Sequence, residues 1–292
     1  MTAAAACAQQ PNTMRWPDLL ERPRPSGSIT IPYGTDPLQV GDLWLPTNSA
    51  SLTQTFPVVL MVHGGCWQTD IADRSIMDWI AADLAGQGIA VWNIDYRGVD
   101  RPGGGYPGTF ADVAAAADHL RTIAPQHRLD TSRIVAFGHS AGGHLALWLA
   151  GRPRLTATSV LAGGDPLPIA SVIASGALPD IEAALALENN GCTTSAMPAL
   201  TGTATPARPD PFADTSIPNL LPLGVRQIFV NASADTIAPP SLATNYAAKA
   251  DAVGEEIDIV TIAGEGHVEL IAPGTRAWAA EVAAIKAELA RR

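Results

Sequence analysis

The sequence Gly138-His139-Ser140-Ala141-Gly142-Gly143 constrains the fold of this chain most strongly, because it lies between two segments of recognisable periodicity. It follows the apolar run Ile134-Val135-Ala136-Phe137, which is typical of a buried strand, and it precedes residues 145–150, which have a helical pattern. A serine in such a tight strand-to-helix turn projects its hydroxyl above the sheet, and the glycines let strand and helix pack closely. The start of the helix also aims the N–H of Ala141 at negative charge that develops beside Ser140. The pattern predicts a nucleophilic serine at this turn.

A second glycine-containing loop supports that prediction, since a G-x-S-x-G pattern alone also occurs in ordinary turns. His63-Gly64-Gly65-Cys66-Trp67 follows the apolar run at residues 58–62. Two consecutive glycines let the backbone approach a reacting carbonyl and point N–H groups at it. We therefore expect an oxyanion hole built from the N–H groups of Gly65, Cys66 and Ala141.

An acid and a base follow two later strand-like runs. Asp235 comes after residues 227–231, and His267 comes after residues 257–262. A carboxylate near an imidazole orients the ring and stabilises its protonated form, so the sequence predicts the triad Ser140, Asp235 and His267. Asp210 and Asp214 are rival acids. The other histidines fall elsewhere: His119 and His127 in or near a surface helix, and His139 and His144 at the serine turn.

Two further residues are expected to contact substrate. His139 precedes the serine, and Trp67 follows the glycine-containing loop. For Trp67, a role as a buried scaffold residue is the alternative. Asp95-Tyr96-Arg97 ends another strand-like run and is expected to brace loops through an ion pair and hydrogen bonds.

Apolar runs and helical segments alternate along most of the chain. Strand-like runs lie at residues 58–62, 89–94, 133–137, 170–174, 227–231 and 257–262, and helical segments lie near residues 73–86, 109–124, 141–151, 240–253 and 276–290. This alternation predicts an α/β fold with a doubly wound, mostly parallel sheet, and two short runs near residues 28–45 predict an antiparallel hairpin at its edge. The proposed catalytic residues all follow strands, so they should meet at the carboxyl edge of the sheet.

The domain organisation follows from the segments that lack this alternation. We expect residues 1–26 to form a flexible N-terminal arm and residues 27–292 to form one domain. Within that domain, residues 176–224 are rich in proline, threonine and alanine and are expected to form a lid over the site, with a disordered insertion as the alternative.

Composition restricts the partners. The chain has 292 residues with 18 basic and 28 acidic side chains, for a net charge of −10. Nucleic acid and anionic membrane surfaces are therefore poor partners. The sequence has no run of about 18 apolar residues, so we expect no transmembrane helix. We expect a small-molecule substrate. The oligomeric state is left open.

The cysteines and the N-terminal residues are less informative. Cys7, Cys66 and Cys192 have no metal-ligand spacing, and we expect Cys66 and Cys192 to be free thiols rather than a disulfide. The first ten residues resemble the end of a bacterial export or lipoprotein signal without its charged and apolar regions, with a plain N-terminal arm as the alternative. Both a cytoplasmic and an exported location remain open.

Together these motifs resemble the α/β-hydrolase superfamily, in particular its esterase and kynurenine-formamidase-like branch. The resemblance runs from about residue 27 to the end, leaves the 176–224 segment unmatched, and is carried by His63-Gly64-Gly65-x-Trp67, Asp95-Tyr96-Arg97, Gly138-His139-Ser140-Ala141-Gly142-Gly143-His144 and the loops of Asp235 and His267. Cys66 departs from the pattern, since many relatives have glycine or an aromatic residue there.

The resemblance implies a hydrolase that needs no metal or cofactor. We expect a serine carboxylesterase that cleaves small to medium esters through an acyl-enzyme. The alternative is an arylformamidase acting on an N-formylkynurenine-type amide, and a non-catalytic binding protein of the same fold is a third reading.

Overall fold

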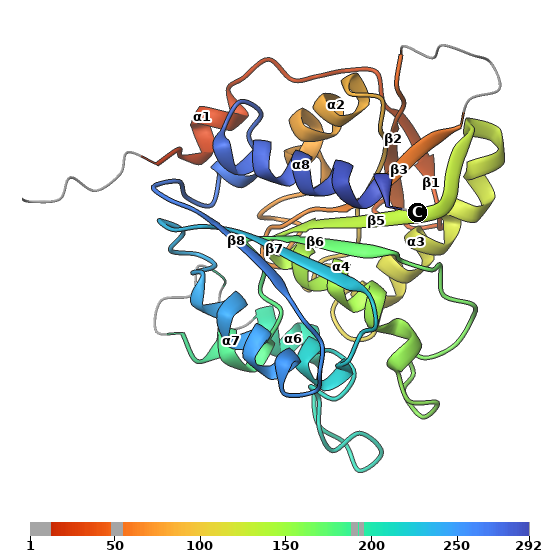
Figure 1. Ribbon diagram of the computed structural model, residues 1–292. Helices are drawn as coiled ribbons and strands as arrows, with labels where there is room; N and C mark the ends of the chain where they lie inside the picture. Colours follow the sequence, from red (N-terminus) through yellow and green to blue (C-terminus); the bar gives the residue numbers. More distant parts are fainter. Residues whose placement is uncertain (1–12, 48–54, 188–191, 193–195, 292) are drawn as a thin grey trace, which may run out of the picture.

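A single twisted sheet organises the chain (Figure 1). This computed structural model describes residues 13–47, 55–187, 192 and 196–291, and within them the sheet has eight strands in the order β1-β2-β4-β3-β5-β6-β7-β8. The strands are β1 (Ile29–Pro32), β2 (Val40–Trp44), β3 (Phe56–Val62), β4 (Ala90–Ile94), β5 (Leu129–His139), β6 (Ser171–Ser175), β7 (Arg226–Ala232) and β8 (Asp258–Ile262).

The strand directions match the sequence prediction. β1 and β2 form an antiparallel hairpin, β2 also pairs antiparallel with β4, and every pair from β4 to β8 is parallel. The predicted doubly wound, mostly parallel sheet with an antiparallel N-terminal hairpin is therefore confirmed. Because the parallel strands share one direction, the loops after β3, β5, β7 and β8 meet at one edge.

Helices cover both faces of the sheet. In Figure 1, α2 and α8 lie on one face and α4 and α7 on the other. The helices are α1 (Trp16–Leu20), α2 (Asp78–Gly86), α3 (Gly108–His127), α4 (Ala141–Gly151), α5 (Ile181–Leu185), α6 (Ala196–Thr201), α7 (Ser241–Asp251) and α8 (Arg276–Ala290). Single 3₁₀ turns lie at η1 (Arg74–Met77), η2 (Arg152–Arg154), η3 (Ile217–Leu220) and η4 (Glu269–Ile271).

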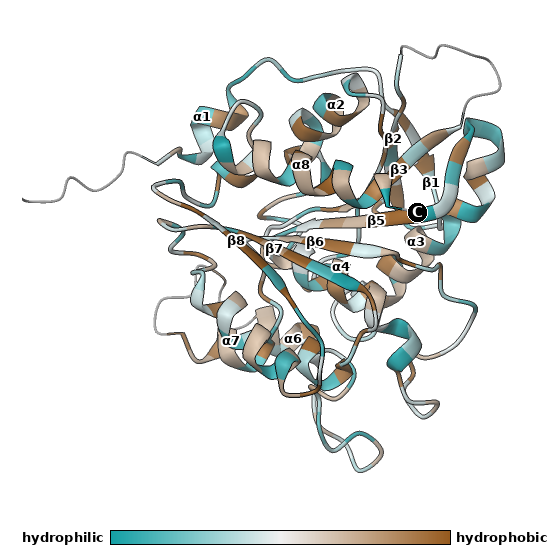
Figure 2. Ribbon diagram, viewed as in Figure 1, coloured by the Kyte–Doolittle hydropathy of each residue, from teal (hydrophilic) through white to brown (hydrophobic). Residues whose placement is uncertain are grey.

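The central strands are apolar on both faces because both faces are covered. In β3, Val58 and Leu60 belong to the apolar cluster beneath α3 and α4, whereas Val59 and Met61 belong to the cluster beneath α2 and α8. This alternation is the two-residue period of a strand. In Figure 2 the central strands of the sheet are mostly hydrophobic, whereas the helices carry both hydrophilic and hydrophobic residues.

The segment at residues 176–224 packs onto the domain. Leu178, Met197 and Leu220 are buried in the cluster that contains α4. His144 and Trp148 of α4 bond through their ring nitrogens to backbone carbonyls of this segment, at 2.7 and 2.9 Å. The described part of the segment is therefore anchored on α4, while residues 188–191 and 193–195 lie outside the described residues.

The structure describes only the second half of the expected N-terminal arm. Residues 1–12, which include the signal-like stretch and Cys7, lie outside the described residues, but residues 13–26 are packed on the domain. Leu19 of α1 is fully buried, and the side chain of Arg22 donates to the carbonyl of Pro273, 2.9 Å away. No helix within the described ranges is long and apolar enough to cross a membrane.

Candidate active site

Ser140 occupies the sharp turn between β5 and α4. Its backbone has φ 56° and ψ −123°, in the left-handed region that is strained for any residue with a side chain. The Ser140 N–H donates to the carbonyl of Ser175 at the end of β6, 2.8 Å away. A Cβ atom on Gly138 would lie 2.1 Å from the carbonyl oxygen of Gly142, so only glycine lets strand and helix approach this closely. The packing around the turn therefore imposes the strained conformation.

Asp235 and His267 form a buried pair at the same edge of the sheet. His267 Nδ1 lies 2.6 Å from Asp235 Oδ2. The other carboxylate oxygen accepts from the N–H groups of Ile237 and Ala238, at 2.8 and 2.9 Å. Because a carboxylate can only accept, Nδ1 carries the proton and Nε2 is left as an acceptor. Asp235 thereby fixes both the orientation and the tautomer of the imidazole.

The rival acids lie elsewhere. Asp210 accepts the N–H of Phe212, and Asp214 pairs with Arg208, whose guanidinium also covers the ring of Tyr106 at 3.8 Å. Both carboxylates stabilise the conformation of the 176–224 segment.

The loop after β3 brings Gly65 and Cys66 to the same cavity as Ser140. Gly65, Cys66 and Trp67 have φ values of 99°, 54° and 56°, three left-handed residues in succession. The Trp67 carbonyl accepts the N–H of Val99 at 2.7 Å, which ties the loop to the segment after β4. Ala141, the third predicted oxyanion donor, directly follows Ser140 as the first residue of α4.

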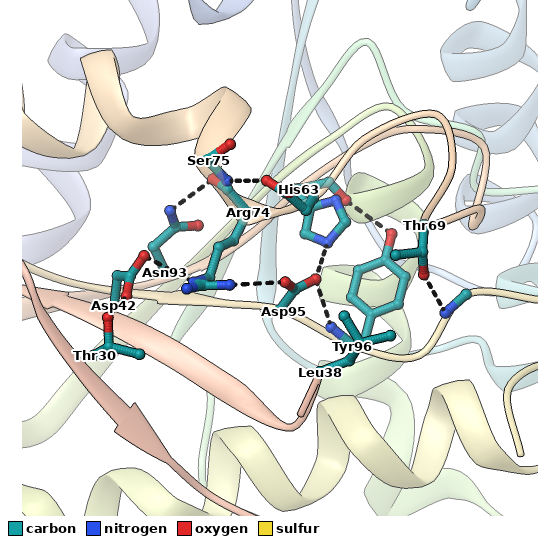
Figure 3. Close-up of polar contacts among 12 residues, drawn as sticks. Thr30, Leu38, Asp42, His63, Thr69, Arg74, Ser75, Asn93, Asp95 and Tyr96 are labelled. Carbon is teal, nitrogen blue, oxygen red and sulfur yellow. Dashed lines mark hydrogen bonds and ion pairs between the residues drawn. The ribbon is translucent and has the colours of Figure 1, made fainter. Parts of the chain in front are cut away.

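A buried polar network lies beneath this loop (Figure 3). Asp95 at the end of β4 bonds to His63 Nε2 at 3.1 Å and to Arg74 Nη1 at 2.9 Å. The ring of Tyr96 stacks on His63 at 4.4 Å, and its hydroxyl donates to the His63 carbonyl. A buried carboxylate with several donors resists displacement, so Asp95 braces the start of the glycine-containing loop, as the sequence suggests.

The two expected substrate-binding residues have different surroundings. His139 lines the cavity, with its ring 4.3 Å from that of His267, and its Nε2 donates to the His267 carbonyl. Burial, with the nearby His267 as a smaller cause, holds the pKa of His139 well below its usual value. The neutral ring therefore adds no positive charge beside His267.

The surroundings of Trp67 favour the scaffold alternative over a contact with substrate. Its side chain is fully buried, and its ring meets the edge of His144 at 5.6 Å instead of reaching the cavity. The three left-handed residues turn the chain so that the indole points into the core, which makes Trp67 a scaffold residue.

The cavity above Ser140 has a volume of about 330 Å³. Its described lining combines the polar groups above with apolar side chains from α1, the 71–76 segment and the Asp235 loop: Trp16, Leu20, Gly65, Cys66, Ile71, Ala72, Ile76, His139, Ser140, Ile237 and His267. None of these lining residues comes from the 176–224 segment. The sequence interpretation missed α1, whose only signal is an aromatic and a leucine in a proline-containing stretch.

Cys66 and Cys192 form a disulfide with a Cα–Cα distance of 5.2 Å, so the expectation of two free thiols is wrong. The two residues are 126 positions apart, and the sequence gives no sign that they meet. They do so because the 176–224 segment folds back beside the glycine-containing loop. The bond joins a predicted oxyanion residue to the segment that we expected to be a lid.

Comparisons with known proteins point to one group of folds. Residues 42–160 match the BD-FAE family. An uncharacterised protein of Mycobacterium tuberculosis (strain H37Rv) is 32% identical over 44% of this chain and 45% of its own length. The 20-hydroxy-prefusarin hydrolase FUS2 of Gibberella moniliformis is 31% identical over 44% of this chain and 32% of its own length. This chain therefore spans less than half the length of these curated relatives.

A solved structure covers more of the chain. A truncated carbohydrate esterase from gut microbiota superposes with a TM-score of 0.74 at 21% identity, over 91% of this chain and 97% of the esterase. At this identity the likeness establishes the fold.

Proposed function

We propose that this chain, an α/β-hydrolase by its fold, is a serine hydrolase that cleaves carboxylic esters. The observation that carries the proposal is a single cavity lined by Ser140 and by His267, which is hydrogen-bonded to Asp235. The similar proteins include a carbohydrate esterase and a fungal hydrolase, whose names support the same chemistry.

The reaction begins with the Ser140 hydroxyl, which is a weak nucleophile until a base takes its proton. His267 can take that proton, because its Nε2 is the free acceptor once Nδ1–H is held by Asp235. Ser140 Oγ then attacks the ester carbonyl and forms a tetrahedral intermediate. Asp235 stabilises the imidazolium that results.

The negative charge on the intermediate needs donors that are already in position. In this proposal the N–H groups of Gly65, Cys66 and Ala141 supply them. Loss of one such donor costs about 10²–10³ in kcat in other hydrolases. The bracing of His63 by Asp95 fits this role, because donors that do not reorganise stabilise the charge most effectively.

The ester bond then breaks as His267 protonates the leaving alkoxide. Water repeats the cycle on the acyl-enzyme: His267 takes a proton from water, the hydroxide attacks the acyl carbon, and Ser140 leaves with the proton. The products are a carboxylic acid and an alcohol.

The test is an activity panel. Purified protein should hydrolyse p-nitrophenyl acetate and butyrate, and Ser140→Ala should lower kcat/KM by at least about 10³-fold, because no other group replaces the nucleophile. N-formylkynurenine is included in the panel. Turnover of that amide without ester turnover would move the assignment to an arylformamidase, and near-normal ester turnover by Ser140→Ala would reject the proposal.

A further inference from the structure

The N-terminal helix α1 forms part of the cavity wall, although it precedes the α/β sheet in the sequence. Trp16 and Leu20 line the cavity together with Ser140 and His267. Figure 1 shows α1 beside the segment that leads into α8. A segment far from the serine in sequence therefore contacts the space in which a substrate would sit.

Hydrogen bonds hold the arm in this position. Glu269 Oε1 accepts the N–H of Met14 at 2.6 Å, and Glu269 Oε2 accepts the N–H of Gly266 at 3.1 Å. One buried carboxylate thus connects the arm to the loop that carries His267. On the other side of α1, Arg24 donates to Asp78, 2.8 Å away. These contacts make α1 a fixed wall of the cavity.

The indole of Trp16 lies over the histidines of the site. Its ring meets His267 edge-on at 6.4 Å and His139 edge-on at 6.5 Å. These are ordinary distances for edge-to-face aromatic pairs. The ring therefore bounds the cavity on the side of His267.

The rest of the wall is apolar. Leu20, Ile71, Ile76 and Ile237 contribute aliphatic surface, and the described lining includes no Lys, Arg, Asp or Glu side chain. A charged substrate group buried there would lose its hydration without gaining a partner. The volume of about 330 Å³ is at the small end of the range for ligand sites. The cavity fits a short, uncharged, apolar group.

We propose that Trp16 is a specificity-determining residue that limits the size of the apolar group of the ester. The inference rests on the proposed esterase function, and it adds the substrate class: neutral esters with a short aliphatic group. Removing the indole extends the cavity next to Ser140. Each further methylene that becomes buried raises kcat/KM about fourfold.

The test compares p-nitrophenyl acetate, butyrate and octanoate in the wild type, Trp16→Ala and Trp16→Phe. We expect Trp16→Ala to raise the octanoate-to-acetate ratio of kcat/KM about tenfold, because the longer acyl chain buries additional methylenes in the enlarged cavity. Trp16→Phe keeps a ring in place and should keep most of the wild-type ratio. Val253→Ala, an exposed apolar position that does not line the cavity, serves as the control and should leave the ratio unchanged.

An unchanged or lower octanoate-to-acetate ratio of kcat/KM in Trp16→Ala would overturn the inference, as would an equal loss of activity on all three esters. A binding measurement separates this inference from the proposed function. Titration calorimetry with 2-hexanone and 2-decanone, which cannot be hydrolysed, should show the same relative gain for the longer ketone in Trp16→Ala. If no ester is cleaved, the esterase proposal fails, and the ketone ratio still decides the role of Trp16.

Discussion

At the scale of single residues, Ser140 shows how a reactive position costs stability. Its φ of 56° is held by the hydrogen bond to Ser175 and by the close packing of the glycines around it. A residue with a side chain in such a conformation costs on the order of 1–3 kcal/mol. The fold bears this cost because the turn presents the serine hydroxyl to the cavity.

Replacing the serine should therefore separate stability from activity. We expect Ser140→Gly to unfold with a free energy about 1 kcal/mol larger than that of Ser140→Ala, because glycine adopts this conformation without strain. Both variants should lose ester hydrolysis. Urea unfolding monitored by circular dichroism measures the difference, and equal midpoints for the two variants would contradict the strain argument.

His144 is a second residue whose burial has a measurable consequence. It is fully buried in α4, it bonds to the Thr215 carbonyl, and burial lowers its pKa to about 4. In the unfolded chain the pKa of histidine is about 6.5. Between these values the unfolded chain binds a proton that the folded protein does not, so stability is fully present above pH 6.5 and is lost as the pH falls toward 4.

The variant His144→Gln should flatten this dependence. We expect the wild type to lose about 3 kcal/mol more unfolding free energy than the variant between pH 7 and pH 4. Glutamine retains an N–H donor for the Thr215 carbonyl. Any change in packing would alter the unfolding free energy by the same amount at every pH, so it would not affect the pH dependence. Unfolding curves in urea at pH 7, 6, 5 and 4 make the comparison, and parallel losses in both proteins would argue against a neutral buried His144.

The sequence predicts some residues of the site and misses others for physical reasons. The sequence predicts Ser140, Asp235 and His267 because each follows a strand, and the carboxyl ends of parallel strands meet at one edge of the sheet. The two roles considered for Trp67 cannot be distinguished from the sequence, because a pattern of glycines does not reveal which way the following side chain points. Trp16 is missed because its contact with the site depends on long-range packing. The catalytic roles of the three residues remain proposals.

At the scale of elements, the 176–224 segment carries the largest correction. The expected pair of free thiols is a disulfide between Cys66 and Cys192. Sequence alone cannot bring these residues together, since irregular segments have no periodicity that fixes their path. The described part of the segment packs on α4, and its role as a lid stays a prediction.

The disulfide should stabilise the fold mainly by restricting the unfolded chain. We expect Cys192→Ala to lower the unfolding free energy by about 2–4 kcal/mol, the usual effect of such a bond. Dithiothreitol should lower the melting temperature of the wild type to near that of the variant and should not affect the variant. An equal effect of dithiothreitol on both proteins would show that the bond between these cysteines is not responsible.

At the scale of the whole molecule, the parallel sheet assembles the site. Ser140 follows β5, Asp235 follows β7, and His267 follows β8, so a shared strand direction brings distant segments to one edge. The fold class is predictable because alternating apolar runs and helices allow few other arrangements. The N-terminal arm and the disulfide are not, because they depend on contacts between segments that lack such a pattern.

The central claim is that Ser140 is a nucleophile activated by His267. Labelling with a fluorophosphonate probe, followed by mass spectrometric mapping, tests it most directly. We predict a single modification at Ser140 in the wild type, at least about a hundredfold slower labelling in His267→Ala, and no labelling in Ser140→Ala. A wild-type protein that is not labelled at Ser140, or a Ser140→Ala variant that still hydrolyses esters at the wild-type rate, would contradict the account.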